Sequence, residues 1–306
     1  MTPTLHSSGD LLADRRYAWA EAALAEGDAR AAADLAEQAL ELAPRYAPAW
    51  FLLGRARENL PGEAARHGAL NAYACALDID PDDALGSRLR VARLGGGQAE
   101  GAIGPGYVRA LFDAYAPRFE RHLVEGLGYR GPALIRAALE AEARPLRFGR
   151  VLDVGCGTGL MARALAGCCD AVVGVDLSPG MLAEARRTGL YARLAEEDLT
   201  RFLAAEPEAA ADLVVAADVL VYVADLAPVL AAAARALVPG GLLACTLQSH
   251  PGEGVVLGDD ARYAHGEAGL RAAVAAAAFS LLRLDAVSTR RDREAEVPGW
   301  LVIANR

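Results

Sequence analysis

The 306-residue sequence contains no lysine, so its 31 basic residues are all arginine. This absence excludes a lysine Schiff base, a lysine general base and a Walker-type phosphate-binding lysine. The sequence also lacks an uncharged apolar run of the ~18 residues that a transmembrane helix requires. Met1–Asp10 do not show the basic and then apolar pattern of a signal peptide. We therefore expect a cytoplasmic protein that has no membrane partner.

Cysteine is scarce too, and its five copies form neither a disulfide framework nor a metal-binding pattern. A C-x-x-C pair or a cysteine–histidine cluster would give metal-ligand spacing, and the sequence contains neither. Cys168 and Cys169 are neighbours, which is compatible with a redox pair, but free cysteine more often serves as a small buried side chain. The sequence therefore predicts no metal site.

Acidic side chains outnumber basic ones by 40 to 31, which gives a net charge of −9. Binding to nucleic-acid phosphates requires a basic footprint, so this charge argues against a nucleic-acid partner. The composition, 54% hydrophobic and 23% charged, predicts a folded chain. Its length is typical of about two domains, and the oligomeric state stays open.

Residues 11–94 are expected to form helix after helix, in two similar blocks. The first block ends at Glu41–Pro44 and the second at Leu77–Pro81, so the two prolines are 37 residues apart. A tetratricopeptide repeat is about 34 residues long and begins W-x-x-L-G, which Trp50–Gly54 match. The segment therefore resembles a pair of these repeats, with an unrelated helical hairpin as the alternative. Such a pair can dock a peptide or brace a second domain, and both interpretations stay open.

Glycine is concentrated at residues 95–106, which predicts a flexible linker and a domain boundary. Three short helical patterns follow, at Tyr107–Tyr115, Pro117–Leu127 and Pro132–Ala143. We expect them to form a helical cap over residues 107–148, at the start of the second domain, 107–306.

From residue 151 onward, short apolar runs alternate with helical patterns, which is typical of a parallel sheet with helices on both faces. The expected strands are Val151–Val154, Ala171–Val175, Leu213–Ala217, Leu242–Leu247, Phe279–Ser288 and Trp300–Ala304, with a further strand before Glu197. The expected helices are Gly159–Ala166, Ser178–Arg187, Asp225–Leu237 and Gly266–Ala278. The last two strands should form a hairpin at an edge of the sheet.

A glycine-rich turn follows the first of these strands, in the sequence V-L-D-V-G-C-G-T-G-L at 151–160. Glycines let the backbone turn sharply and let a ligand approach the main chain. Leu160 stands where a GxGxxG dinucleotide fingerprint needs its third glycine. Asp153 places a carboxylate at the strand end, where it would repel a pyrophosphate and attract a cationic group.

Acidic residues also follow the next three strands. Asp176 ends the second strand, where a carboxylate can accept both hydroxyls of a ribose. Asp198 and Leu199 follow the third strand, and the carboxylate there can accept an adenine amino group. Asp218 follows the fourth strand, at the edge where open α/β folds bind ligands.

On these residues, the region 103–306 resembles the class I S-adenosylmethionine-dependent methyltransferases. The resemblance implies a Rossmann-like, seven-stranded, mostly parallel sheet, preceded here by the all-helical repeat domain. It implies S-adenosyl-L-methionine as cofactor and S-adenosyl-L-homocysteine as product. The cofactor-binding residues that it implies are Asp153, Gly155, Cys156, Gly157, Gly159, Asp176, Leu177, Met181, Asp198, Leu199, Asp218 and Tyr115.

The whole chain resembles, more narrowly, predicted bacterial methyltransferases that carry N-terminal tetratricopeptide repeats. The supporting stretches are Phe112–Leu123, Ala216–Tyr222 and Arg262–His265. Two residues of this pattern keep alternative roles. Asp218 can instead cap a helix or line the substrate side, and Tyr115, with Phe119, can shield the methyl group or pack in the core.

Methyl transfer is an in-line displacement, so the protein mainly aligns the nucleophile and excludes water. A base is needed only if the acceptor arrives protonated. The candidate catalytic residues are His265, Tyr263 and Tyr222. His265 is the preferred base because its pKa is tunable, with a purely structural histidine as the alternative.

Two missing motifs restrict the class of methyl acceptor. No D/N-P-P-Y/F sequence follows the fourth strand, which argues against methylation of adenine or glutamine amide nitrogen. No Asp/Asp/Asn metal constellation is recognisable, which argues against a magnesium-dependent catechol reaction. A small-molecule O, N or C acceptor is our first hypothesis. A protein methyltransferase that docks its target on the repeats, and a non-catalytic adaptor, are the alternatives.

Overall fold

The computed structural model describes residues 7–143, 145–293 and 295–306. The chain divides into two compact units, Met1–Ala110 and Leu111–Arg306. The division falls inside helix α6 (Pro105–Tyr115), shortly after the expected glycine linker. Among the described residues, no helix has the length and hydrophobicity needed to cross a membrane.

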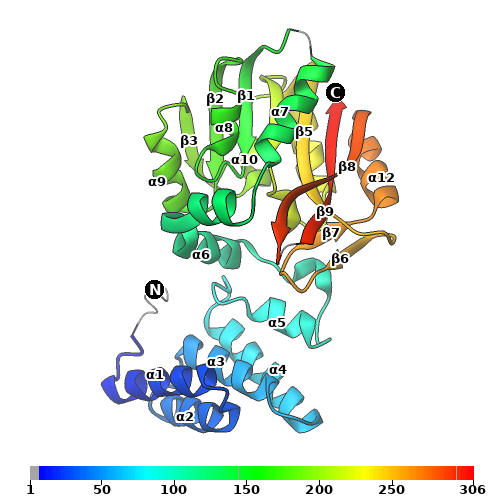
Figure 1. Ribbon diagram of the computed structural model, residues 1–306. Helices are drawn as coiled ribbons and strands as arrows, with labels where there is room; N and C mark the ends of the chain where they lie inside the picture. The colour runs from blue at the N-terminus through cyan, green and yellow to red at the C-terminus, as the bar shows by residue number, and fades with distance from the viewer. Residues whose placement is uncertain (1–6, 144, 294) are drawn as a thin grey trace. The chain divides into compact units, whose positions relative to one another are not determined.

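The first unit is helical, as expected, and its helices pack in chain order: α1 on α2, α2 on α3 and α3 on α4 (Figure 1). Their bounds are α1 Leu11–Ala25, α2 Ala29–Leu42, α3 Ala47–Glu58, α4 Glu63–Ile79 and α5 Ser87–Arg93, with a 3-10 turn at Ala99–Gly101. Small residues make this close packing possible. A Cβ atom on Gly54 would lie 2.5 Å from the Tyr73 ring, so α3 and α4 can approach only because residue 54 is glycine.

The start of the second unit is less regular than its sequence pattern predicted. The expected single helix at Pro117–Leu127 is instead a 3-10 turn, Ala116–Arg118, followed by a π-helical segment, Arg121–Gly126. Helix α7, Gly131–Glu142, follows as predicted. Residues 111–126 are called the cap segment below.

The sheet of the second unit has nine strands among the described residues, in the order β3-β2-β1-β4-β5-β7-β6, with β9 paired to β5 and β8 to β9. Their bounds are β1 Phe148–Val154, β2 Cys169–Asp176, β3 Arg193–Glu196, β4 Ala211–Ala216, β5 Leu237–Ser249, β6 Val255–Leu257, β7 Tyr263–His265, β8 Ser280–Asp292 and β9 Ala295–Asn305. Strands β1 to β5 are parallel and β8–β9 is an antiparallel hairpin, so the seven expected strands are present. The short strands β6 and β7 were not predicted, because three residues are too few to show a period.

Strand β7 prolongs the sheet at one particular place. At Gln248, one edge of β5 pairs with Gly299 of β9 and the other edge pairs with Ala264 of β7. The β4 pairing ends earlier, at Ala216 with Cys245. Strand β7 therefore takes the place of β4 beyond the carboxyl end of that strand, where the ligand-binding edge of such sheets lies.

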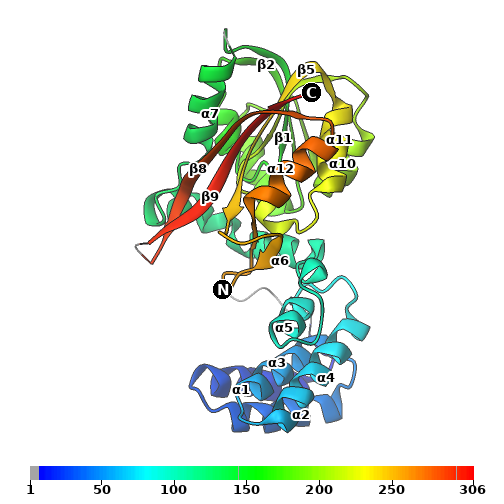
Figure 2. The same ribbon diagram turned by 90° about the vertical axis from the view of Figure 1, so that its right-hand side faces the viewer.

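Helices cover both faces of the sheet, with α7 on one side and α10, α11 and α12 on the other (Figure 2). The bounds of the remaining helices are α8 Leu160–Ala164, α9 Pro179–Arg187, α10 Leu199–Ala205, α11 Ala227–Ala236 and α12 Glu267–Ala276. Along β4, Leu213 and Val215 belong to one hydrophobic core while Val214 and Ala216 belong to the other. This alternation explains why each strand reads as an unbroken apolar run.

Candidate functional site

The site is built where β1 to β4 end, because the carboxyl ends of parallel strands meet at the same edge of a sheet. Asp153 lies near the end of β1, and Asp176 is the last residue of β2. Asp198 follows β3 and Asp218 follows β4. The acidic residues that the sequence singled out therefore lie along one edge.

The glycine loop after β1 adopts a backbone that other residues would strain. Gly155, Gly157 and Gly159 have φ angles of +68°, +52° and +91°. A Cβ atom on Gly155 would also lie 2.3 Å from the side chain of Val219, which follows β4. Cys156, between Gly155 and Gly157 in the chain, is buried, and its backbone N–H donates to the Val175 carbonyl at 2.9 Å. The loop is thus fixed against both neighbouring strands.

Asp176 fixes the other side of this loop. Its carboxylate accepts hydrogen bonds from the backbone N–H groups of Gly157 and Ser178, each at 2.9 Å. Burial raises its pKa from the ordinary value. Leu177 and Met181 lie at the adjoining start of α9, and Met181 is almost fully buried. Asp176 therefore joins the end of β2 to the glycine loop, and its ribose-binding role stays a prediction.

Asp153 has a partner that sequence reasoning missed. Its carboxyl group is buried and accepts a hydrogen bond from the Tyr191 hydroxyl at 2.7 Å. Burial raises the pKa of Asp153 to about 7. The Tyr191 ring occupies space that only glycine leaves open, since a Cβ atom on Gly174 would lie 2.7 Å from it. A glycine inside a buried strand was the available signal for such a close approach.

Asp198 serves as the N-cap of α10, and Leu199 is the first residue of that helix. One carboxylate oxygen, Oδ1, accepts from the backbone N–H groups of Thr200 and Arg201 at 3.0 and 3.1 Å. This cap fixes the carboxylate at the sheet edge. The adenine-binding role of Asp198 stays a prediction.

Asp218 is turned toward β5 and β8. It has a left-handed backbone, with φ of +55°, and its Oδ1 accepts from the Thr246 hydroxyl at 2.8 Å. Its Oδ2 accepts from the Thr289 hydroxyl at 2.7 Å and from Arg290 Nη1 at 3.2 Å. The possibility that Asp218 caps a helix is therefore wrong, because both carboxylate oxygens are bonded across the sheet.

Aromatic rings of the cap segment connect the glycine loop to the segment after β4. Phe119 lies against Gly157, and its ring centroid is 5.3 Å from that of Tyr115. Phe112 packs edge-on against Phe119 at 6.1 Å and against Tyr222 at 5.5 Å. Tyr115 also contacts the His122 ring through its hydroxyl. These rings form what we call the aromatic row, from Tyr222 to Gly157.

The cap segment is tied to α9 as well. Asp113 Oδ1 accepts from the Ser178 hydroxyl and from the backbone N–H of Gly180. Ser178 in turn caps α9, so one hydroxyl links the cap segment to the helix beside Asp176. Asp113 was part of the stretch that carried the family resemblance, but its contact with α9 had no signal in the sequence.

The candidate catalytic residues lie on β7 and just after β4. Tyr263 and His265 are both buried in β7. His265 Nε2 lies 3.1 Å from the Val223 carbonyl, and burial lowers its pKa to about 4, so the ring is neutral at pH 7. Only Nδ1 can then accept a proton while Nε2 donates to Val223. The Tyr222 hydroxyl accepts from Arg262 Nε at 3.3 Å. The base role of His265 stays a prediction.

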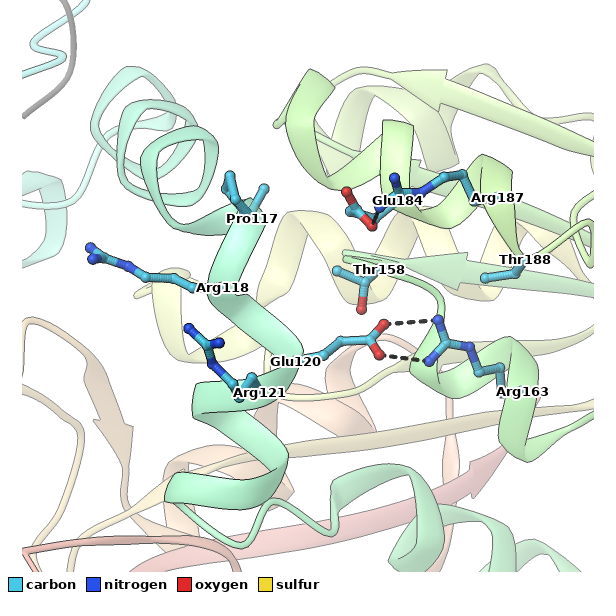
Figure 3. A pocket seen from close by; sticks show the side chains of 10 residues that line it. Pro117, Arg118, Glu120, Arg121, Thr158, Arg163, Glu184, Arg187 and Thr188 are labelled. Atoms are coloured by element: carbon cyan, nitrogen blue, oxygen red, sulfur yellow. Dashed lines mark hydrogen bonds and ion pairs between the residues drawn. The ribbon is translucent and has the colours of Figure 1, made fainter. Parts of the chain in front are cut away.

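A pocket of about 430 Å³ lies between the cap segment and helices α8 and α9 (Figure 3). Its described lining includes Thr158 of the glycine loop but none of the strand-end aspartates. The lining residues are Ala116, Pro117, Arg118, Glu120, Arg121, Thr158, Arg163, Glu184, Arg187 and Thr188. Glu120 reaches across the pocket to Arg163, which it binds with both oxygens at 2.8 and 2.9 Å (Figure 3). The pocket therefore lies beside the glycine loop, and its described lining includes no residue of the segment after β4.

Comparison with known proteins agrees with this geometry. A family model described as a methyltransferase domain matches residues 152–245, which include the glycine loop and all strand ends from β1 to β4. The solved 1,6-didemethyltoxoflavin-N1-methyltransferase of Burkholderia thailandensis is similar in fold, with a TM-score of 0.52 and 20% identity over 68% of this chain and 96% of that chain. The expected class I methyltransferase fold is thus confirmed. Residues 152–245 of the chain match a methyltransferase domain.

Two curated relatives are similar in sequence over parts of their length. A ubiquinone biosynthesis O-methyltransferase of Thiobacillus denitrificans is 43% identical over 102 residues, covering 32% of this chain and 43% of that protein. A trans-aconitate 2-methyltransferase of Methylobacterium nodulans is 34% identical over 176 residues, covering 56% of this chain and 60% of that protein. The chain thus spans less than two thirds of the length of either relative.

Proposed function

We propose that this protein is an S-adenosylmethionine-dependent methyltransferase that acts on an oxygen of a small molecule. The observation that carries the proposal is the position of Asp176, which bonds the glycine loop from the end of the neighbouring strand. The methyltransferase-domain match covers the same residues. The relatives named as a ubiquinone biosynthesis O-methyltransferase and a trans-aconitate 2-methyltransferase support a small acceptor.

The residues present fit the cofactor in their chemistry. Gly157 leaves the main chain open to the methionine part, and Asp176 offers its carboxylate to the ribose hydroxyls. Asp198 and Leu199 bind the adenine. The cofactor supplies a methyl group already activated on a sulfonium. What remains for the protein is to orient the acceptor and to exclude water, and we assign the exclusion of water to the aromatic row, which lies against the glycine loop at Gly157.

For the helical unit, we propose a pair of tetratricopeptide repeats. Its support is the 37-residue spacing of the two blocks and the consecutive packing of α1 to α4. Such a pair would dock a protein target if the enzyme methylated proteins, or brace the catalytic domain if it methylated metabolites. Incubation with methyl-labelled cofactor and cell extract separates the two, since label enters either macromolecules or metabolites.

Binding of S-adenosyl-L-homocysteine, measured by calorimetry, tests the cofactor site. Asp176→Ala should weaken binding about 10- to 100-fold, because a hydrogen bond to a charged group contributes about 1.5–3 kcal/mol. Asp170→Ala is the matched control, as Asp170 lies exposed at the opposite end of β2. If Asp176→Ala binds as well as the wild type, the proposed site is misplaced.

A further inference from the structure

Four charged side chains meet beside the aromatic row, and we call them the arginine–aspartate cluster: Asp218, Asp260, Arg262 and Arg290. They come from the end of β4, from the turn between β6 and β7, and from β8. Arg290 lies 3.2 Å from Asp218 Oδ2 and 3.7 Å from Asp260 Oδ2. Arg262 Nη1 lies 3.4 Å from the same oxygen of Asp260. The two arginines thus share one carboxylate.

The two arginines differ in burial. The Arg290 side chain is 5% exposed and also donates to Gln248 Oε1 at 3.1 Å, so it is held on several sides. The Arg262 side chain is 27% exposed. It contacts the Tyr222 hydroxyl at 3.3 Å and Asp260 at 3.4 Å. Because its side chain is more exposed than that of Arg290, Arg262 is the member of the cluster that a further partner can reach.

The charge of the cluster indicates what that partner is. Two guanidinium groups and two carboxylates leave the cluster neutral. Arg262 is the more exposed cation of the cluster, so an anion is the partner that its guanidinium would bind. Arginine suits a carboxylate in particular, because its planar fork matches both oxygens of that group.

The aromatic row gives the acceptor its orientation. Arg262 lies at one end of the row, with its guanidinium 5.9 Å from the Tyr222 ring centroid. The row continues through Phe112 and Phe119 to Gly157 at the glycine loop. An acceptor anchored at Arg262 would lay its apolar part along these rings, toward the loop.

We propose that the methyl acceptor is a small carboxylic acid whose carboxylate binds Arg262, with Tyr222 and Asp260 orienting the guanidinium. This inference rests on the proposed function and adds the class of acceptor and the residue that selects it. Arg290 keeps its partners Asp218 and Gln248 and holds the cluster in place. Neutral acceptors of the same size would lack the paired oxygens that the guanidinium fork binds.

Acceptor pools separated by charge test this inference. The small-molecule fraction of a cell extract is divided by anion exchange into a retained and a flow-through pool, and each is incubated with the full-length protein and methyl-labelled S-adenosylmethionine. We expect at least tenfold more transfer with the retained pool. Arg262→Gln should raise the amount of that pool needed for half-maximal rate about 10- to 100-fold while cofactor binding stays unchanged. Arg262→Lys, which keeps the charge but not the fork, should fall between.

The control is Arg271→Gln on α12, where the arginine is half-exposed and pairs with Glu267. It should behave as the wild type. Transfer mainly from the flow-through pool, or full transfer by Arg262→Gln from the retained pool, overturns the inference and leaves the proposed function intact. Absence of transfer from both pools by a protein that binds the cofactor overturns the proposed function itself.

Discussion

The buried carboxyl group of Asp153 should make the protein less stable as the pH rises. Burial raises its pKa from 3.8 to about 7, and the folded protein therefore holds a proton that the unfolded chain has lost between these two values. Stability falls wherever the folded state binds more protons than the unfolded state. The loss thus develops between about pH 4 and pH 7 and is complete above pH 7. At 1.36 kcal/mol per unit, it amounts to about 4 kcal/mol at most.

Asp153→Asn removes the titration and keeps the shape of the side chain. Its amide oxygen can still accept from the Tyr191 hydroxyl, which bonds the carboxyl group at 2.7 Å in the wild type. Free energies of unfolding are measured by urea titration at pH 5, 6, 7 and 8. The free energy of unfolding of the variant, relative to that of the wild type, should increase as the pH rises and level off above pH 7.

The matched control is Asp170→Asn, an exposed carboxylate on the neighbouring strand. Its difference from the wild type should stay small at every pH, because an exposed pair contributes about 1 kcal/mol or less. A constant difference between Asp153→Asn and the wild type from pH 5 to pH 8 would refute the reasoning. Parallel curves would mean that Asp153 titrates alike in the folded and unfolded states.

Two further substitutions test the packing and the charge pairing of the site. Gly174→Ala should destabilise the protein by about 1–3 kcal/mol, because its Cβ would lie 2.7 Å from the Tyr191 ring inside a packed core, and a lower midpoint in urea would show it. Arg290→Met should cost about 3–5 kcal/mol, because it leaves Asp218 without its buried charge partner. A thermal midpoint within 1–2 °C of the wild type for Arg290→Met would mean that this pair is not buried in solution.

The strand–helix alternation and the acidic strand ends could be predicted from the sequence for a simple geometric reason. A buried strand reads as an apolar run, and parallel strands bring their carboxyl ends together. Asp153, Asp176, Asp198 and Asp218 could therefore be assigned to one edge without knowing any side-chain contact.

The partners of these aspartates could not be predicted. Arg290 and Asp218 are 72 positions apart, and nothing in a one-dimensional pattern says which strand-end carboxylate an arginine on β8 will face. Tyr191 reaches Asp153 from 38 positions away, through the gap that Gly174 leaves. The state of His265 could not be predicted either. Its neutral ring and its backbone partner, the Val223 carbonyl, depend on the position of β7 beyond the end of β4.

The β6–β7 hairpin can be regarded as an exchangeable part. Its registered pairing with the main sheet consists of Gln248 with Ala264 and Ser249 with His265, yet its turn and second strand carry Asp260, Arg262 and Tyr263. The glycine loop and Asp176 lie on other strands and do not depend on the sequence of the hairpin. Replacing residues 255–265 with a hairpin of equal length could therefore retarget the enzyme to new acceptors and leave its methyl donor untouched.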